Sequence, residues 1–133
     1  MSDQPNSNKK ILIVDDDKFL LDMYALKFNK SGYEVKTCDS TDGCLKLLRE
    51  GYMPDIMLCD IVMPGMDGLD MVATVRKEKL AGSAKVIMLT NQGSPEDLSR
   101  AKSLNVDGYI IKATTIPSEV LAEVEKIISG KNK

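Results

Sequence analysis

The stretch ILIVDDD, residues 11–17, decides the fold of this chain. Its first four residues are apolar and mostly β-branched, which is typical of a short strand that helices cover on both faces. Three aspartates follow at once. Asp16 or Asp17 is suited to begin a helix, because a carboxylate accepts hydrogen bonds from the free N–H groups of a first turn. The stretch therefore predicts a buried strand that leads directly into a helix.

The same alternation recurs along the chain. Strand-like runs cover residues 11–14, 33–38, 55–59, 85–89 and 108–111. Helical patterns follow them, from Asp16 or Asp17 to a stop at Gly32 and then over residues 42–50, 69–78, 95–104 and 117–129. Five such pairs with short connections predict parallel strands joined by right-handed crossovers. We therefore expect an α/β fold: a doubly wound, five-stranded parallel sheet in the flavodoxin-like order 2-1-3-4-5, with five helices.

Local signals predict the starts and inner faces of these helices. Asp67 is expected to cap the helix over 69–78, and Ser94 followed by Pro95 is expected to begin the next one. Helical spacing predicts that the first helix turns inward the residues Phe19, Leu20, Met23, Leu26 and Phe28. It predicts the same for the last helix with Val120, Leu121, Val124, Ile127 and Ile128.

The length of 133 residues fits one domain. Residues 1–8 are polar and are expected to be a disordered lead, residues 9–130 to be the domain, and residues 131–133 to be a short tail. The net charge of −2 gives no electrostatic reason to expect nucleic acid or an anionic membrane as a partner.

The cysteines and the apolar runs indicate the compartment. Cys38, Cys44 and Cys59 show no CxxC spacing, and the chain contains no histidine to complete a zinc site. Reduced thiols are the simpler interpretation. No apolar run approaches the length of a membrane span, and residues 1–8 lack the apolar core of a signal peptide. We therefore expect a cytoplasmic protein.

Charged residues stand where three of the predicted strands end. The aspartates 15–17 follow the first strand, Asp60 follows the third, and Lys112 follows the fifth. The carboxyl ends of parallel strands open into one crevice, so these side chains are expected to meet. Converging carboxylates repel unless a cation neutralises them, and Mg²⁺ is suited to such oxygen ligands beside a phosphate. The alternative for the aspartates is that they only cap the helix that follows.

Three further residues have a functional and a simpler interpretation. Lys112 is either a solvated surface lysine or a point charge for a phosphoryl oxygen or a carboxylate. Thr90 is either a polar strand terminus or a hydroxyl for the same oxygens. Tyr109 is expected to bury part of its ring and to keep its hydroxyl in water.

Taken together, these residues resemble the receiver domain of two-component response regulators. The resemblance is carried by Asp15-Asp16, by Asp60 with the segment MPGMDG at 63–68, by Thr90, and by Tyr109 ahead of Lys112. It extends over about residues 10–129.

The resemblance implies a phosphoacceptor role for Asp60 and a bound Mg²⁺. It implies that Asp16, Asp60 and the backbone carbonyl of Val62 ligate the metal directly, and that Asp15 helps through water. It also implies that Lys112 and Thr90 contact the phosphoryl group, and that Thr90 and Tyr109 form a switch. The chain departs from the family at Ala113, where a proline is usual, and at Asn91, where a small residue is favoured and the larger side chain is expected to slow access to Asp60.

The same resemblance implies partners and a mode of action. A sensor histidine kinase or a phosphotransfer protein would supply the phosphoryl group. The receiver would assist its own phosphorylation and dephosphorylation without being an enzyme for a separate substrate. An output protein or a second copy would dock on the face built from the helix after Ser94, the strand with Tyr109 and the helix from Pro117. The sequence leaves open whether the chain is a stand-alone receiver or a piece of a longer regulator.

Two other functions compete with this one. A haloacid-dehalogenase-like phosphatase would use Asp15 as nucleophile with Asp17, Thr90 and Lys112. Against it, Lys18-Phe19 replaces the residues expected after the second acid, and no acidic pair follows Lys112. The third hypothesis is a receiver-shaped interaction module that is never phosphorylated.

Overall fold

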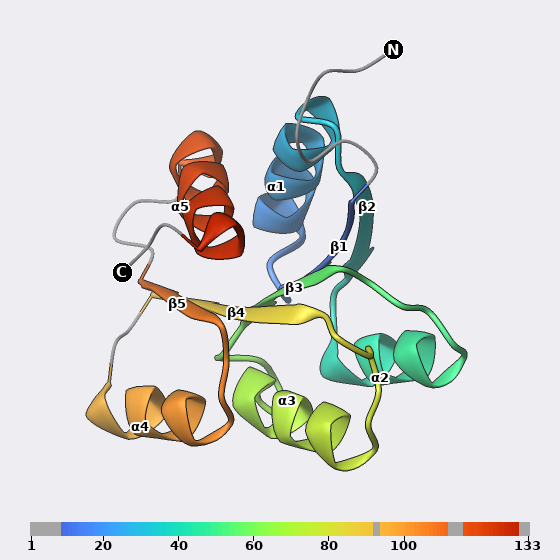
Figure 1. Cartoon of the computed structure of the whole chain (residues 1–133), viewed down its shortest axis with the longest axis vertical. Coiled ribbons are helices and arrows are strands. Elements are labelled where there is room, and N and C mark those ends of the chain that lie inside the picture. Colours follow the sequence, from blue (N-terminus) through green and yellow to red (C-terminus); the bar gives the residue numbers. More distant parts are fainter. Residues whose placement is uncertain (1–8, 92–93, 112–115, 131–133) are drawn as a thin grey trace.

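The central element is a parallel sheet of five strands (Figure 1). The computed structural model describes residues 9–91, 94–111 and 116–130. Its strands are β1 (Lys10–Val14), β2 (Glu34–Cys38), β3 (Ile56–Asp60), β4 (Lys85–Thr90) and β5 (Gly108–Ile111). They lie in the order β2-β1-β3-β4-β5, and every neighbouring pair is parallel. The predicted fold is confirmed.

Five helices cover the two faces of this sheet. They are α1 (Lys18–Lys30), α2 (Thr41–Arg49), α3 (Gly68–Lys77), α4 (Pro95–Ser103) and α5 (Pro117–Ser129). Figure 1 shows α1 and α5 on one face and α2, α3 and α4 on the other. Each helix connects two parallel strands or follows the last one, as the alternation in the sequence predicted.

Side-chain alternation divides the apolar interior into two clusters, one on each face of the sheet. On the α1/α5 face, Ile11 and Ile13 of β1 pack with Leu58 of β3 and with the inner side chains of the two helices. On the α2–α4 face, Leu12 and Met57 from the same strands pack under the other three helices. Because both faces are covered, the central strands are apolar at successive positions.

Polar side chains fix the start of four helices. Asp17 accepts hydrogen bonds from two backbone N–H groups of α1, Ser40 accepts one from Gly43, Asp67 one from Asp70, and Ser94 one from Asp97. The predicted roles of Asp67 and Ser94 are therefore confirmed. The Ser40 cap was not predicted, and it starts α2 one residue earlier than expected. At α5 no side chain of the described residues caps the start, and Pro117 stands in the first turn.

The predicted inner face of α1 is wrong in part. Phe19 and Leu26 are 73% and 60% exposed, whereas the buried residues are Leu21, Tyr24 and Phe28. Most positions between Phe19 and Phe28 are apolar, so spacing within the helix alone does not select one stripe. The selection comes from the tertiary contacts of α1 with the sheet and with α5.

Candidate functional site

The site lies at the carboxyl ends of β1 and β3, which are neighbours in the sheet. Asp60 is the last residue of β3, and Asp15 directly follows β1. Asp15 is two residues after Ile13, and Asp60 is two residues after Leu58, and both of these apolar side chains face α1 and α5. Because side chains alternate along a strand, the two aspartates face the same side of the sheet. Asp15 and Asp60 are 2% and 8% exposed, whereas Asp16 is exposed. The crossover order thus brings together two buried carboxyls that are 45 residues apart in sequence.

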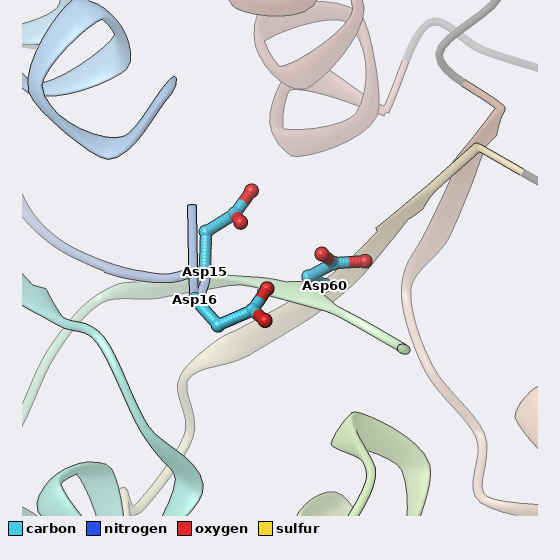
Figure 2. A group of neighbouring side chains, drawn as sticks. All are labelled: Asp15, Asp16 and Asp60. Atoms are coloured by element: carbon cyan, nitrogen blue, oxygen red, sulfur yellow. The ribbon is translucent and has the colours of Figure 1, made fainter. Parts of the chain in front are cut away.

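Three carboxyl groups converge there. Figure 2 shows Asp15 and Asp16 beside Asp60. One ligand oxygen from each lies within 4.8 Å of the other two. Among the described residues, this is the one group of three or more acidic or cysteine side chains arranged closely enough to hold a metal ion. An all-oxygen set with one exposed member fits a hard cation that keeps part of its water, as Mg²⁺ does.

A cavity of about 340 Å³ opens at these carboxyls. Its lining residues are Asp15, Asp16, Asp17, Leu20, Asp60, Val62 and Asn91. Val62 is 62% exposed at its rim. The predicted metal residues therefore share one cavity, and Asn91 is also in its lining.

The three successive aspartates have different local roles. Asp17 is engaged by α1, since its Oδ1 accepts from the backbone N–H groups of Phe19 at 3.0 Å and Leu20 at 3.2 Å. Asp15 accepts from the backbone N–H of Asp17 at 2.9 Å, which fixes its carboxyl at the turn. The alternative that the aspartates only cap the helix is thus correct for Asp17. The carboxyls of Asp15 and Asp16 belong to the group of three with Asp60.

Backbone packing fixes the loop that follows Asp60. Gly68 donates its N–H to the carbonyl of Ile61 at 2.8 Å, and a Cβ at this position would overlap the carbonyl oxygen of Asp60. Only glycine allows this close approach. The loop is thereby closed against the end of β3, which places Val62 at the cavity.

Thr90 and Tyr109 lie on the opposite face of the sheet. Thr90 is fully buried at the end of β4, two residues after Met88, and Met88 is paired with Tyr109 of β5. Strand alternation therefore puts Thr90 and Tyr109 on the α4 side. The Tyr109 hydroxyl is buried, with no hydrogen-bond partner among the described residues. The prediction that it lies in water is wrong, because the ring packs against the α2–α4 cluster.

Lys112 and Ala113 lie outside the described residues. Their predicted roles therefore stay predictions.

Comparison with known proteins identifies the family. Residues 11–125 match the response regulator receiver domain family. The chain belongs to this family. The receiver is 32% identical over 121 residues to the alkaline phosphatase synthesis transcriptional regulatory protein PhoP of Bacillus subtilis, covering 91% of this chain and 49% of PhoP. It thus spans about half the length of the curated relatives it matches.

Solved structures agree with this assignment. A CheY-like receiver domain protein of Methanospirillum hungatei superimposes with a TM-score of 0.81 at 30% identity, over 94% of this chain and 98% of that one. Chemotaxis protein CheY4 of Vibrio cholerae gives a TM-score of 0.81 at 26% identity, over 91% and 99%.

The phosphatase hypothesis finds no support in this receiver. It requires Asp17 to work with Asp15 in catalysis, but the Asp17 carboxylate is occupied at the start of α1.

No described helix is long and apolar enough to cross a membrane.

A larger hollow of about 500 Å³ lies at the other end of the sheet, before β4 and β5. The Arg76 guanidinium at its wall already donates to the carbonyls of Leu104 and Asn105. The group of three carboxyls lies at the smaller cavity and not at this larger hollow.

Sequence reasoning missed two residues. Tyr24 of α1 is fully buried in the cluster on the α1/α5 face, and Arg100 of α4 is paired with Asp67 and Asp70 of the α3 region. For Tyr24 the sequence did carry a signal, because it is a tyrosine within the apolar stretch of α1. For the contacts of Arg100 with α3 the sequence carries no signal, because Asp67 and Asp70 are 33 and 30 residues away.

Proposed function

We propose that this receiver accepts a phosphoryl group from a phosphohistidine donor onto Asp60 in a Mg²⁺-dependent reaction. The observation that carries the proposal is the buried carboxyl of Asp60 at an open cavity, with Asp15 and Asp16 beside it. A carboxylate in this position is accessible to a donor and protected from bulk water on the side of the sheet.

The transfer is a displacement at phosphorus. An oxygen of Asp60 attacks, a P–O bond forms, the P–N bond to the donor imidazole breaks, and the imidazole takes up a proton. Such a reaction depends on in-line positioning and on neutralising the phosphoryl oxygens. Bound Mg²⁺ supplies positive charge for that neutralisation.

The remaining roles follow the family resemblance. Asp16, Asp60 and the Val62 carbonyl would hold the metal, and Asp15 would act through a water molecule. Lys112 and Thr90 would contact the phosphoryl group. The protein is then a phosphoacceptor that assists its own phosphorylation and dephosphorylation, and not an enzyme acting on a separate substrate.

A change of surface is the proposed output. Thr90 moves toward the phosphoryl group, and Tyr109 turns into the space it leaves. The buried hydroxyl of Tyr109 has no partner among the described residues, which supports this idea, since an unsatisfied group gains from reaching a new partner. The face formed by α4, β5 and α5 would then bind an output protein or a second copy, with neither nucleic acid nor a membrane as a partner.

We also propose the boundaries and compartment predicted from the sequence. Residues 9–130 form the receiver, residues 1–8 a lead and residues 131–133 a tail. The cytoplasm is the proposed compartment, and the three free cysteines are compatible with it.

Intact-protein mass spectrometry tests the phosphoacceptor. With Mg²⁺ and a small phosphodonor, we expect one added phosphoryl group, which Asp60→Asn abolishes. Asp17→Asn is the matched control and should be labelled normally, because asparagine caps a helix about as well as aspartate. Full labelling of Asp60→Asn, or a phosphoryl group on Asp15, would contradict the proposal.

Hydrogen exchange tests the output. A beryllofluoride mimic should change protection in α4 and around Tyr109 as well as at the cavity loops. Changes confined to the loops at Asp15 and Asp60 would instead indicate a phosphoryl carrier without a conformational switch.

A further inference from the structure

Tyr24 is a buried polar group that the receiver chemistry above does not use. Its side chain is fully buried within the cluster on the α1/α5 face. Its hydroxyl is also buried and has no hydrogen-bond partner among the described residues. Burying a hydroxyl without a hydrogen-bond partner costs free energy. The simplest reason for a tyrosine at this position is that its hydroxyl finds a partner in another state of the site.

The position of Tyr24 points to the acidic cavity. It lies one helical turn after Leu20, which lines that cavity. Side chains of a helix lean back toward its N-terminus, so the Tyr24 ring leans toward Leu20 and the cavity. Asp15 and Asp60 continue the strand positions that face the cluster containing Tyr24. The hydroxyl therefore lies on the same side of the sheet as these two carboxyls.

Electrostatics agrees with this placement. Burial, followed by the negative charges of Asp15, Asp60 and Asp17, raises the pKa of Tyr24 to about 12. The hydroxyl therefore keeps its proton at neutral pH and is available as a donor. Asp15 exerts the largest of the three charge effects.

We infer that Tyr24 is a positioning residue of the acidic cavity, a role that rests on the proposed function of that cavity. Its hydroxyl donates a hydrogen bond to the Asp15 carboxylate, directly or through one bound water, when the cavity is loaded with a divalent cation. A carboxylate offers about four lone-pair positions, so this bond adds to the one that Asp15 accepts from the Asp17 N–H. Partners of this kind orient metal-binding groups and tune the affinity of the site.

The test is a Mg²⁺ titration of Tyr24→Phe, followed by NMR of the amides near Asp16, Asp60 and Val62. The variant removes one oxygen and keeps the ring that packs in the core. We expect Mg²⁺ affinity to fall about tenfold. Tyr52→Phe is the matched control, because the Tyr52 hydroxyl is also buried without a described partner but packs against the cluster on the other face. Its affinity for Mg²⁺ should equal that of the wild type.

A second measurement does not depend on any variant. With ¹³Cζ-labelled tyrosine in the wild-type protein, saturating Mg²⁺ should shift the Tyr24 resonance and leave that of Tyr52 in place. Unchanged Mg²⁺ affinity in Tyr24→Phe, an equal loss in Tyr52→Phe, or an unshifted Tyr24 resonance would each overturn the inference.

Labelling separates this inference from the proposed function. If the wild-type protein takes no phosphoryl group from the donor, the phosphoacceptor proposal fails, and the titration still decides the role of Tyr24. If Asp60 is labelled and Tyr24→Phe binds Mg²⁺ as the wild type does, only the role of Tyr24 fails.

Discussion

Helices α4 and α5 flank β5 in the proposed output face, but different interactions hold them in place. α5 buries Val120, Leu121 and Val124, whereas Ala101 is the one buried side chain of α4. Leu98, the largest apolar residue of α4, is 39% exposed. One helix is therefore fixed by the hydrophobic effect, and the other has little apolar area to keep it in place.

Ion pairs connect α4 to its neighbour α3. Arg100 pairs with Asp67 at 3.2 Å, with Asp70 at 2.7 Å and with Asp97 of its own helix at 3.8 Å. Asp67 also caps α3 at the end of the loop that begins after Asp60. The pairs of a partly exposed arginine are weak, so α4 can shift at a smaller cost than α5. Helix α4 is therefore held less firmly than α5.

The largest expected effect is in α5. Val124→Ala removes two fully buried methyl groups and leaves a cavity. We expect the free energy of unfolding to fall by about 2 kcal/mol. Urea denaturation measures it, and a loss below about 0.5 kcal/mol would mean that α5 is not held by its apolar face.

The next effect is in α4. Arg100→Met keeps most of the side-chain stem and removes the charge. We expect a loss of less than about 1 kcal/mol, and a smaller one at high salt, because the side chain is 40% exposed. Native-state hydrogen exchange should show faster exchange in α4 with α5 unchanged. Lys102→Met, an exposed position of the same helix, is the control; equal acceleration there would contradict the role of Arg100.

A pH titration sharpens the same comparison. Burial acts to raise the pKa of Asp67, but the hydrogen bond from the Asp70 N–H and the Arg100 guanidinium outweigh it, and the pKa lies below its usual value. The unfolded chain therefore binds this proton more readily. The resulting stability is present above about pH 4 and is lost as the pH falls through the lower, folded pKa. In Arg100→Met, NMR titration should find the Asp67 pKa closer to its usual value; an unchanged pKa would assign the shift to the helix cap alone.

The smallest effect is expected at Leu98. Leu98→Ser should change the free energy of unfolding by no more than about 0.5 kcal/mol, because much of this side chain is already in water. A loss above 1 kcal/mol in urea denaturation would show that α4 packs through Leu98, and the contrast with α5 would then fail.

The sequence by itself determined the elements and their order. The apolar run before Asp15, the cap residues Asp67 and Ser94, and the helical stripe of α5 act over a few residues, so they are readable from local spacing and local hydrogen bonds. The same reasoning predicted that Asp15, Asp16 and Asp60 meet, because parallel strands end at one edge of the sheet.

Only the tertiary structure decided the rest. It buried Tyr24, exposed Phe19 and Leu26, and joined Arg100 to Asp67. Nothing local distinguishes these outcomes, since most positions along α1 are apolar and the partners of Arg100 in the α3 region lie about 30 residues away in sequence. The connections between the strands decide which helix surfaces and which charged side chains lie next to each other. Burial and ion pairing depend on this arrangement of residues that are far apart in sequence.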